Sequence, residues 1–133
     1  DPNVKAAVNI GGPIHLAFTR DHIKNVPDVM IATIAHAMRE GLEDNLDRQG
    51  EGSEPMSLKL QGLLEKPERQ APLLSINGDQ DDLVPIEDLY LISKSGIEQE
   101  EWVYAGDGHC AHASMAEYVP KAAAWLKQHL IQQ

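Results

Sequence analysis

The chain has 133 residues and a formal net charge of −10, with 21 acidic and 11 basic side chains. This length suits a single domain with a buried core, and the excess of carboxylates argues against nucleic-acid backbones and anionic membranes as partners. Cys110 is the only cysteine, which excludes an internal disulfide. No apolar run reaches membrane-spanning length and no signal peptide is visible, so we expect a cytoplasmic protein.

The amino-terminal part of the chain predicts a strand followed by a helix. The chain starts at Asp1-Pro2 without a methionine, which indicates a processed or shortened polypeptide. Residues 4–10 predict a short strand, and Gly11-Gly12-Pro13 ends it. Residues 28–40 carry apolar side chains at helical spacing and predict a helix.

A second helix is expected after a polar loop over residues 43–54, with Ser53 as its cap. One face of this helix would carry Met56, Leu60, Leu63 and Leu64. A charged segment over residues 65–71 then leads into the next strand.

The carboxyl-terminal part alternates strands with helices. A short apolar run over residues 72–77 predicts a strand buried on both faces, as in a parallel sheet. A helix over residues 85–95 and a strand over residues 101–105 follow. The last helix is expected over residues 120–131, with Pro120 in its first turn, and residues 113–119 as a separate turn of helix.

This order of elements predicts an α/β fold, a three-layer sandwich in which parallel strands are flanked by helices. Three strands are few for such a sheet, and the chain has the character of half a domain. We expect the open edge of the first strand to pair with a missing amino-terminal half or a second copy of the chain, or to be covered by the segment after Pro13.

Acidic and basic side chains follow two of the predicted strands. Asp79, Asp81 and Asp82 come after residues 72–77, and His109 and His112 come after residues 101–105. Because the carboxyl ends of parallel strands meet at one edge of the sheet, an acid and a base are expected to meet there. Taken alone, an aspartate in this place also suits a turn, and a histidine also suits an exposed loop. Asp79 and Asp82 fit turn or solvated positions, and His112 is an alternative base if the loop register differs.

These two segments carry a resemblance to a known fold family. Residues 78–85, Gly-Asp-Gln-Asp-Asp-Leu-Val-Pro, resemble the G-x-x-D-x-x-V-P acid loop of α/β-hydrolases, and Gly106-Asp107-Gly108-His109 resembles their histidine loop. Residues 8–15 and 57–64 are similar to the esterase family of the fermentation–respiration switch protein. Residues 108–112 and 118–126 are similar to the dihydropseudooxynicotine hydrolases. The resemblance covers residues 1–133, but only the carboxyl-terminal half of the family domain.

The resemblance implies a role for each loop. Asp81 matches the acid and His109 the base of a Ser-Asp-His triad, while the G-x-S-x-G turn of the nucleophile is absent from this sequence and would precede Asp1. Residues 14–70 match the place of a cap, or lid, insertion. The implied function is the carboxyl-terminal part of a cofactor-free serine hydrolase that acts on ester or C–C bonds of a small, partly apolar substrate and is inactive alone. Two alternatives are a non-catalytic regulatory or interaction module of the switch-protein type and a structural fragment without activity.

The same residues bear on two further kinds of chemistry, metal binding and thiol catalysis. The carboxylates and histidines of the two loops could gather around a metal ion, but the sequence has no H-E-x-x-H motif, no paired cysteines and no calcium-loop pattern. We therefore expect no metal and no cofactor. Cys110 is expected to be a small packing residue, because neighbours on an extended loop point in opposite directions.

Overall fold

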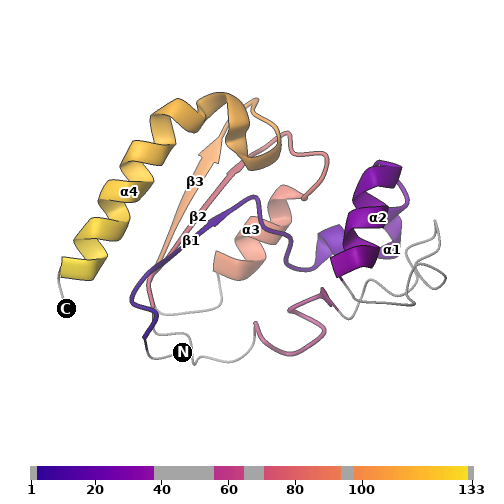
Figure 1. Cartoon of the computed structure of the whole chain (residues 1–133), viewed down its shortest axis with the longest axis horizontal. Helices are drawn as coiled ribbons and strands as arrows, with labels where there is room; N and C mark the ends of the chain where they lie inside the picture. Colours follow the sequence, from indigo (N-terminus) through magenta and orange to yellow (C-terminus); the bar gives the residue numbers. More distant parts are fainter. Residues whose placement is uncertain (1–2, 38–55, 65–70, 94–97, 132–133) are drawn as a thin grey trace.

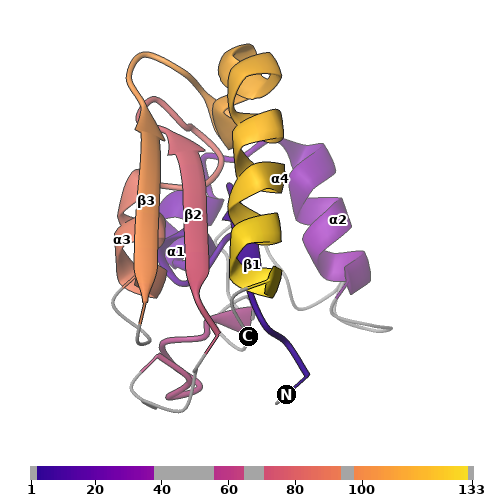
Figure 2. The same ribbon diagram turned by 90° about the vertical axis from the view of Figure 1, so that its left-hand side faces the viewer.

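A three-stranded parallel sheet with helices on both faces forms the body of the protein (Figure 1). The computed structural model describes residues 3–37, 56–64, 71–93 and 98–131. The strands are β1 (Ala7–Ile10), β2 (Leu73–Gly78) and β3 (Gln99–Tyr104), in the order β1-β2-β3. Helix α4 (Met115–Ile131) covers one face and α3 (Ile86–Ser93) the other, which confirms the predicted three-layer α/β fold (Figures 1 and 2).

The central strand β2 is buried along its whole length. Leu74 and Ile76 point toward α4 and form a core with Tyr118, Ala122 and Trp125. Their neighbours in the strand alternate to the opposite face, on the side of α3. This two-sided burial explains why the strand is a nearly continuous apolar run, as its sequence predicted.

Helix α4 is longer than the sequence predicted. It begins at Met115, directly after the short 3-10 helix η3 (His109–Ser114), so Pro120 lies inside the helix and not in its first turn. Pro120 has no N–H to donate to the carbonyl four residues before it. Because Pro120 is exposed, water can bond this carbonyl instead. Glu100 of β3 fastens the helix to the sheet, because its carboxylate accepts hydrogen bonds from the indoles of Trp102 (2.8 Å) and Trp125 (2.7 Å).

After β1, residues 14–37 hold three short elements, η1 (Leu16–Phe18), α1 (Arg20–Ile23) and α2 (Asp28–Ala37). Helix α2 confirms the helix predicted from residue 28, and its predicted end at residue 40 lies outside the described residues. The expected loop over residues 43–54 and the Ser53 cap also lie outside them.

The second helix expected between β1 and β2 is wrong for the described residues 56–64, which form successive turns. The Ser57 hydroxyl accepts the Leu60 N–H, and Gly62 adopts a left-handed φ of 67°, a conformation that interrupts a helix. Leu60 and Leu63, which were expected on the apolar face of that helix, are exposed.

The remaining bounds shift by a few residues. The first strand starts at Ala7 and not at residue 4, and the third spans Gln99–Tyr104 and not residues 101–105. Helix α3 ends at Ser93, and the predicted extension to residue 95 lies outside the described residues. No helix in the described part of the chain is long and apolar enough to cross a membrane.

Among the described strands, β1 pairs with β2 alone. The N–H groups of Ala7 and Gly11 donate to the Pro72 and Ile76 carbonyls of the β2 side, each at 2.9 Å. Alternation along the strand therefore directs the N–H groups of Val8 and Ile10 to the opposite edge.

We expect this edge to pair with another strand. In dilute solution the amides of Val8 and Ile10 should exchange with solvent faster than those of Ala7 and Gly11, and at high concentration they should become protected as the chain associates. Hydrogen exchange followed by NMR, together with the measured molecular mass, checks this. A monodisperse monomer in which Val8 and Ile10 exchange rapidly at every concentration would contradict it.

Candidate active site

The acid loop (residues 79–85) and the histidine loop (residues 105–110) meet beyond the carboxyl ends of β2 and β3. Asp81 Oδ2 and His109 Nδ1 lie 2.9 Å apart, within hydrogen-bond distance. The Asp81 side chain is 0% exposed, whereas the His109 side chain is 39% exposed. The structure therefore brings together the two residues that the sequence singled out, with the acid enclosed and the base facing outward.

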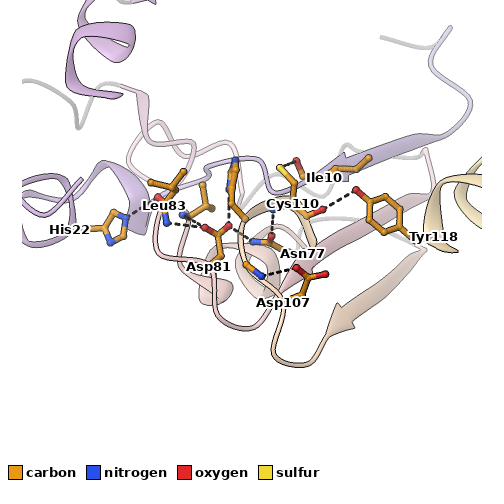
Figure 3. A network of polar contacts seen from close by, with 11 residues as sticks. Ile10, His22, Asn77, Asp81, Leu83, Asp107, Cys110 and Tyr118 are labelled. Atoms are coloured by element: carbon orange, nitrogen blue, oxygen red, sulfur yellow. Dashed lines mark hydrogen bonds and ion pairs between the residues drawn. The ribbon is translucent and has the colours of Figure 1, made fainter. Parts of the chain in front are cut away.

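Hydrogen bonds from several directions hold the Asp81 carboxylate (Figure 3). Oδ1 accepts the N–H groups of Leu83 (2.8 Å) and Val84 (3.0 Å), and Oδ2 accepts the side-chain amide of Asn77 (2.8 Å) as well as His109. Burial by itself would raise the pKa of Asp81, but these bonds, led by that of Val84, lower it below the ordinary aspartate value. Asp81 is therefore ionised at neutral pH.

The state of Asp81 decides the tautomer of His109. An ionised carboxylate can only accept hydrogen bonds, so Nδ1 of the neutral imidazole carries the proton and Nε2 carries a free lone pair. No residue of the described ranges makes a hydrogen bond to Nε2. A histidine with its Nδ1 held by a carboxylate and its Nε2 open is suited to act as a general base.

Gly78, the last residue of β2, allows the backbone of the histidine loop to pack directly against the end of the strand. A Cβ at this position would overlap the backbone of Asp107 and Gly108. The Asp107 carbonyl accepts the Gln80 N–H at 2.9 Å, and Asp79 Oδ1 accepts the Gly106 N–H at 2.7 Å. The two loops are thus bonded to each other, and the backbone N–H that the exposed Asp79 carboxylate accepts belongs to the histidine loop and not to its own turn.

Asp107 organises the segment after His109. Its carboxylate accepts the N–H groups of Gly108 (2.8 Å), Ala113 (3.2 Å) and Ser114 (2.9 Å). Desolvation opposes the charge, but the hydrogen bonds, with those of Ser114 largest, lower the pKa of Asp107 below its ordinary value. The Asp107 carboxylate therefore fixes the turn that carries His109 and the residues that lead into α4.

The backbone after His109 is not the extended loop that the sequence suggested. Cys110 and Ala111 have left-handed φ values of 59° and 46°, a conformation that costs a non-glycine residue about 1–2 kcal/mol. The turn is held by its surroundings, since Tyr118 donates its hydroxyl to the Cys110 carbonyl at 2.8 Å and Ala111 is fully buried. The Cys110 thiol lies 3.7 Å from the Ile10 carbonyl at the end of β1.

The other candidate residues lie outside this pair. His112 and Asp82 are exposed, and neither side chain makes a hydrogen bond with the described residues. The structure therefore places His109, and not His112, beside Asp81. No group of three His, Cys, Asp or Glu side chains in the described part of the chain is arranged to hold a metal ion.

Sequence reasoning missed two buried residues that support the site. Asn77 bonds both loops, and Asp88 of α3 accepts the N–H groups of four consecutive residues, Ile14 to Ala17, at 2.7–3.1 Å. The sequence signal for Asn77 was a polar residue at the end of an apolar strand. Asp88 had no such signal, because an aspartate near the start of a helix is ordinarily explained by the helix dipole.

With this geometry in view, comparison with known proteins identifies the family. The model of the FrsA-like esterases, described as Esterase FrsA-like, matches residues 1–130. The chain belongs to this family. None of the curated protein sequences compared with it matches.

Solved structures show the same fold. AbyA5 superposes with a TM-score of 0.67 at 18% sequence identity, over 99% of this chain and 36% of AbyA5. The 2,6-dihydroxy-pseudo-oxynicotine hydrolase superposes with a TM-score of 0.66 at 17% identity, over 96% of this chain and 34% of that protein. The FrsA-like chain thus has part of an α/β-hydrolase fold and spans about a third of the length of either protein.

Replacing Asp107 with Asn should destabilise the histidine loop. An unfolded aspartate takes up its proton at higher pH than the folded one, so the stability that Asp107 contributes is present above the ordinary pKa of 3.8 and is lost as the pH falls through the lowered value. Asp107→Asn should lower the melting temperature at neutral pH and flatten its decline in acid. Asp82→Asn, at an exposed position, should do neither. Thermal unfolding scans between pH 2.5 and 7 check this, and an Asp107→Asn curve that coincides with the wild-type curve would contradict it.

Proposed function

We propose that this chain supplies the acid and the base of a serine-hydrolase triad, with Asp81 as the acid and His109 as the base. The observation that carries the proposal is the 2.9 Å hydrogen bond from His109 Nδ1 to an enclosed carboxylate, with Nε2 left open. Membership in a family of esterases supports the same reaction class. Neither side chain needs a cofactor for this work.

The chemistry follows from the positions of the two ring nitrogens. His109 Nε2 takes the proton of a serine hydroxyl as the serine oxygen attacks the substrate carbonyl, and His109 later returns this proton to the leaving group. Asp81 keeps the ring in the Nδ1–H tautomer and stabilises the imidazolium without taking its proton. Water, activated by the same histidine, then releases the acyl group.

The nucleophile comes from polypeptide outside residues 1–133, since this sequence contains no G-x-S-x-G turn. In this fold the serine precedes the acid and the histidine along the chain, and its turn follows a strand of the same sheet. The edge of β1 that the described residues leave open is where such a strand would pair. The same edge would also allow two copies of the chain to associate.

Residues 14–70 form the cap of the site in this proposal. Two contacts bond the described part of the segment to the body. Asp88 holds the backbone of residues 14–17, and His22 Nε2 lies 2.8 Å from the Leu83 carbonyl of the acid loop. A cap fixed at its start and beside Asp81 can limit access to His109. A small, partly apolar ester or a substrate with a cleavable C–C bond fits such a site.

A regulatory module without activity is the competing function. A binding module has no need for an ionised acid that holds one histidine tautomer, so the Asp81–His109 geometry favours the hydrolase.

A fluorophosphonate probe tests the proposal in the natural polypeptide that contains this chain. The probe should label one serine outside residues 1–133, and the isolated chain should remain unlabelled. His109→Ala and Asp81→Asn should each reduce labelling and hydrolysis of p-nitrophenyl acetate by about 10²- to 10⁴-fold.

His112→Ala is the matched control and should retain wild-type labelling, because the exposed His112 makes no hydrogen bond to Asp81. Labelling that survives His109→Ala but is lost in His112→Ala would show that the base is misassigned. A natural polypeptide that neither reacts with the probe nor hydrolyses the ester would contradict the hydrolase proposal and favour the regulatory module.

A further inference from the structure

The side chain of Asn77 joins the acid loop to the histidine loop. Asn77 lies in β2 directly before Gly78 and is 1% exposed. Its Nδ2 donates to Asp81 Oδ2 at 2.8 Å, and its Oδ1 accepts the Cys110 N–H at 2.9 Å (Figure 3). The backbone N–H can only donate and the ionised carboxylate can only accept, so both ends of the amide have a fixed place.

We propose that Asn77 is a positioning residue for the Asp81–His109 pair, holding the carboxylate of the acid and the peptide after the base at one fixed separation. The inference rests on the proposed function, since it concerns how the same base is prepared.

The hydrogen bond from Asn77 to Asp81 limits rotation of the Asp81 carboxylate. Asp81 Oδ1 is bound by two backbone N–H groups, and Oδ2 is bound by Asn77 and His109. With Asn77 in place, four donors surround the group and leave it one orientation. Without Asn77, His109 is the only donor to Oδ2 in the described part of the chain. The carboxylate that orients His109 would then depend on His109 for its own orientation.

The peptide end of the link controls the path of the chain after His109. Cys110 has a left-handed φ of 59°, and its N–H is bound by Asn77 while its carbonyl is bound by the hydroxyl of Tyr118. Bonds on both sides of one residue maintain a conformation that the residue would not favour alone. Since His109 is the preceding residue, the direction of its side chain depends on this turn.

Ser75 provides a matched control. It lies two residues before Asn77, on the same face of β2, and is 0% exposed. Its hydroxyl has no hydrogen-bond partner among the described residues. Ser75→Ala therefore removes a buried polar group from the same strand without breaking a hydrogen bond to any of them.

The first test uses the wild-type chain and requires no variant to fold. In an NMR titration, the side-chain amide of Asn77 should shift with the same midpoint as the carboxyl carbon of Asp81. An Asn77 amide that does not respond when Asp81 takes up its proton would overturn the inference.

Two variants then separate the two ends of the link. Asn77→Asp keeps an acceptor for the Cys110 N–H but sets a second carboxylate against Asp81. The Cys110 amide should stay protected from exchange, while protonation at Asp81 moves to higher pH. Asn77→Ala should lose the protection of the Cys110 amide and also move the Asp81 titration to higher pH, and Ser75→Ala should change neither.

In the natural polypeptide, Asn77→Ala should lower kcat for p-nitrophenyl acetate by about 10²-fold, the loss expected when reacting groups are misplaced, with KM little changed. If Asn77→Ala lowers the melting temperature but leaves the Asp81 titration and kcat at the Ser75→Ala values, Asn77 is only a packing residue and the inference is overturned. If the NMR results hold but the natural polypeptide carries no reactive serine, the proposed function fails while the positioning role stands.

Discussion

The site depends on the close contact between the histidine loop and the end of β2. Gly78 has no side chain, so the backbone of Asp107 and Gly108 lies directly against the strand. This contact places Gln80 and Asp79 within bonding distance of the histidine loop and sets His109 beside Asp81. The glycine that opens the acid loop is therefore required because another backbone occupies the space of its side chain.

Backbone N–H groups stabilise three carboxylates at and near this contact. Asp81, Asp88 and Asp107 accept hydrogen bonds from the backbone of the acid loop, of residues 14–17 and of the histidine turn, respectively. Each carboxylate thereby fixes a loop or a short turn outside the long helices and the strands. This arrangement suits a chain with 21 acidic but only 11 basic residues. It also makes the stability of the loops depend on pH. The pKa values of Asp81 and Asp107 are lowered in the folded chain, so the stability that these carboxylates contribute is lost as the pH falls through the lowered values.

The sequence predicted those parts of the structure that follow from local pattern. The apolar run of β2 and the alternation of strands and helices gave the three-layer fold, and the paired loops gave the contact between Asp81 and His109. Predictions failed where a side-chain hydrogen bond to the backbone, or a left-handed residue, decides where a helix can form. Pro120 looked like the start of a helix, but Asp107 had already turned the chain before Met115. Leu60 and Leu63 had helical spacing, yet Ser57 and the left-handed Gly62 form turns there.

The central claim is that His109, held by Asp81, acts on a serine from outside residues 1–133. A crystal structure of the natural polypeptide after reaction with a fluorophosphonate measures this directly, as the distance from His109 Nε2 to Oγ of the modified serine. We predict a separation of about 2.6–3.2 Å with the Asp81–His109 hydrogen bond intact. A modified serine beyond the reach of His109, or one that has the ring of His112 beside it, would contradict the account.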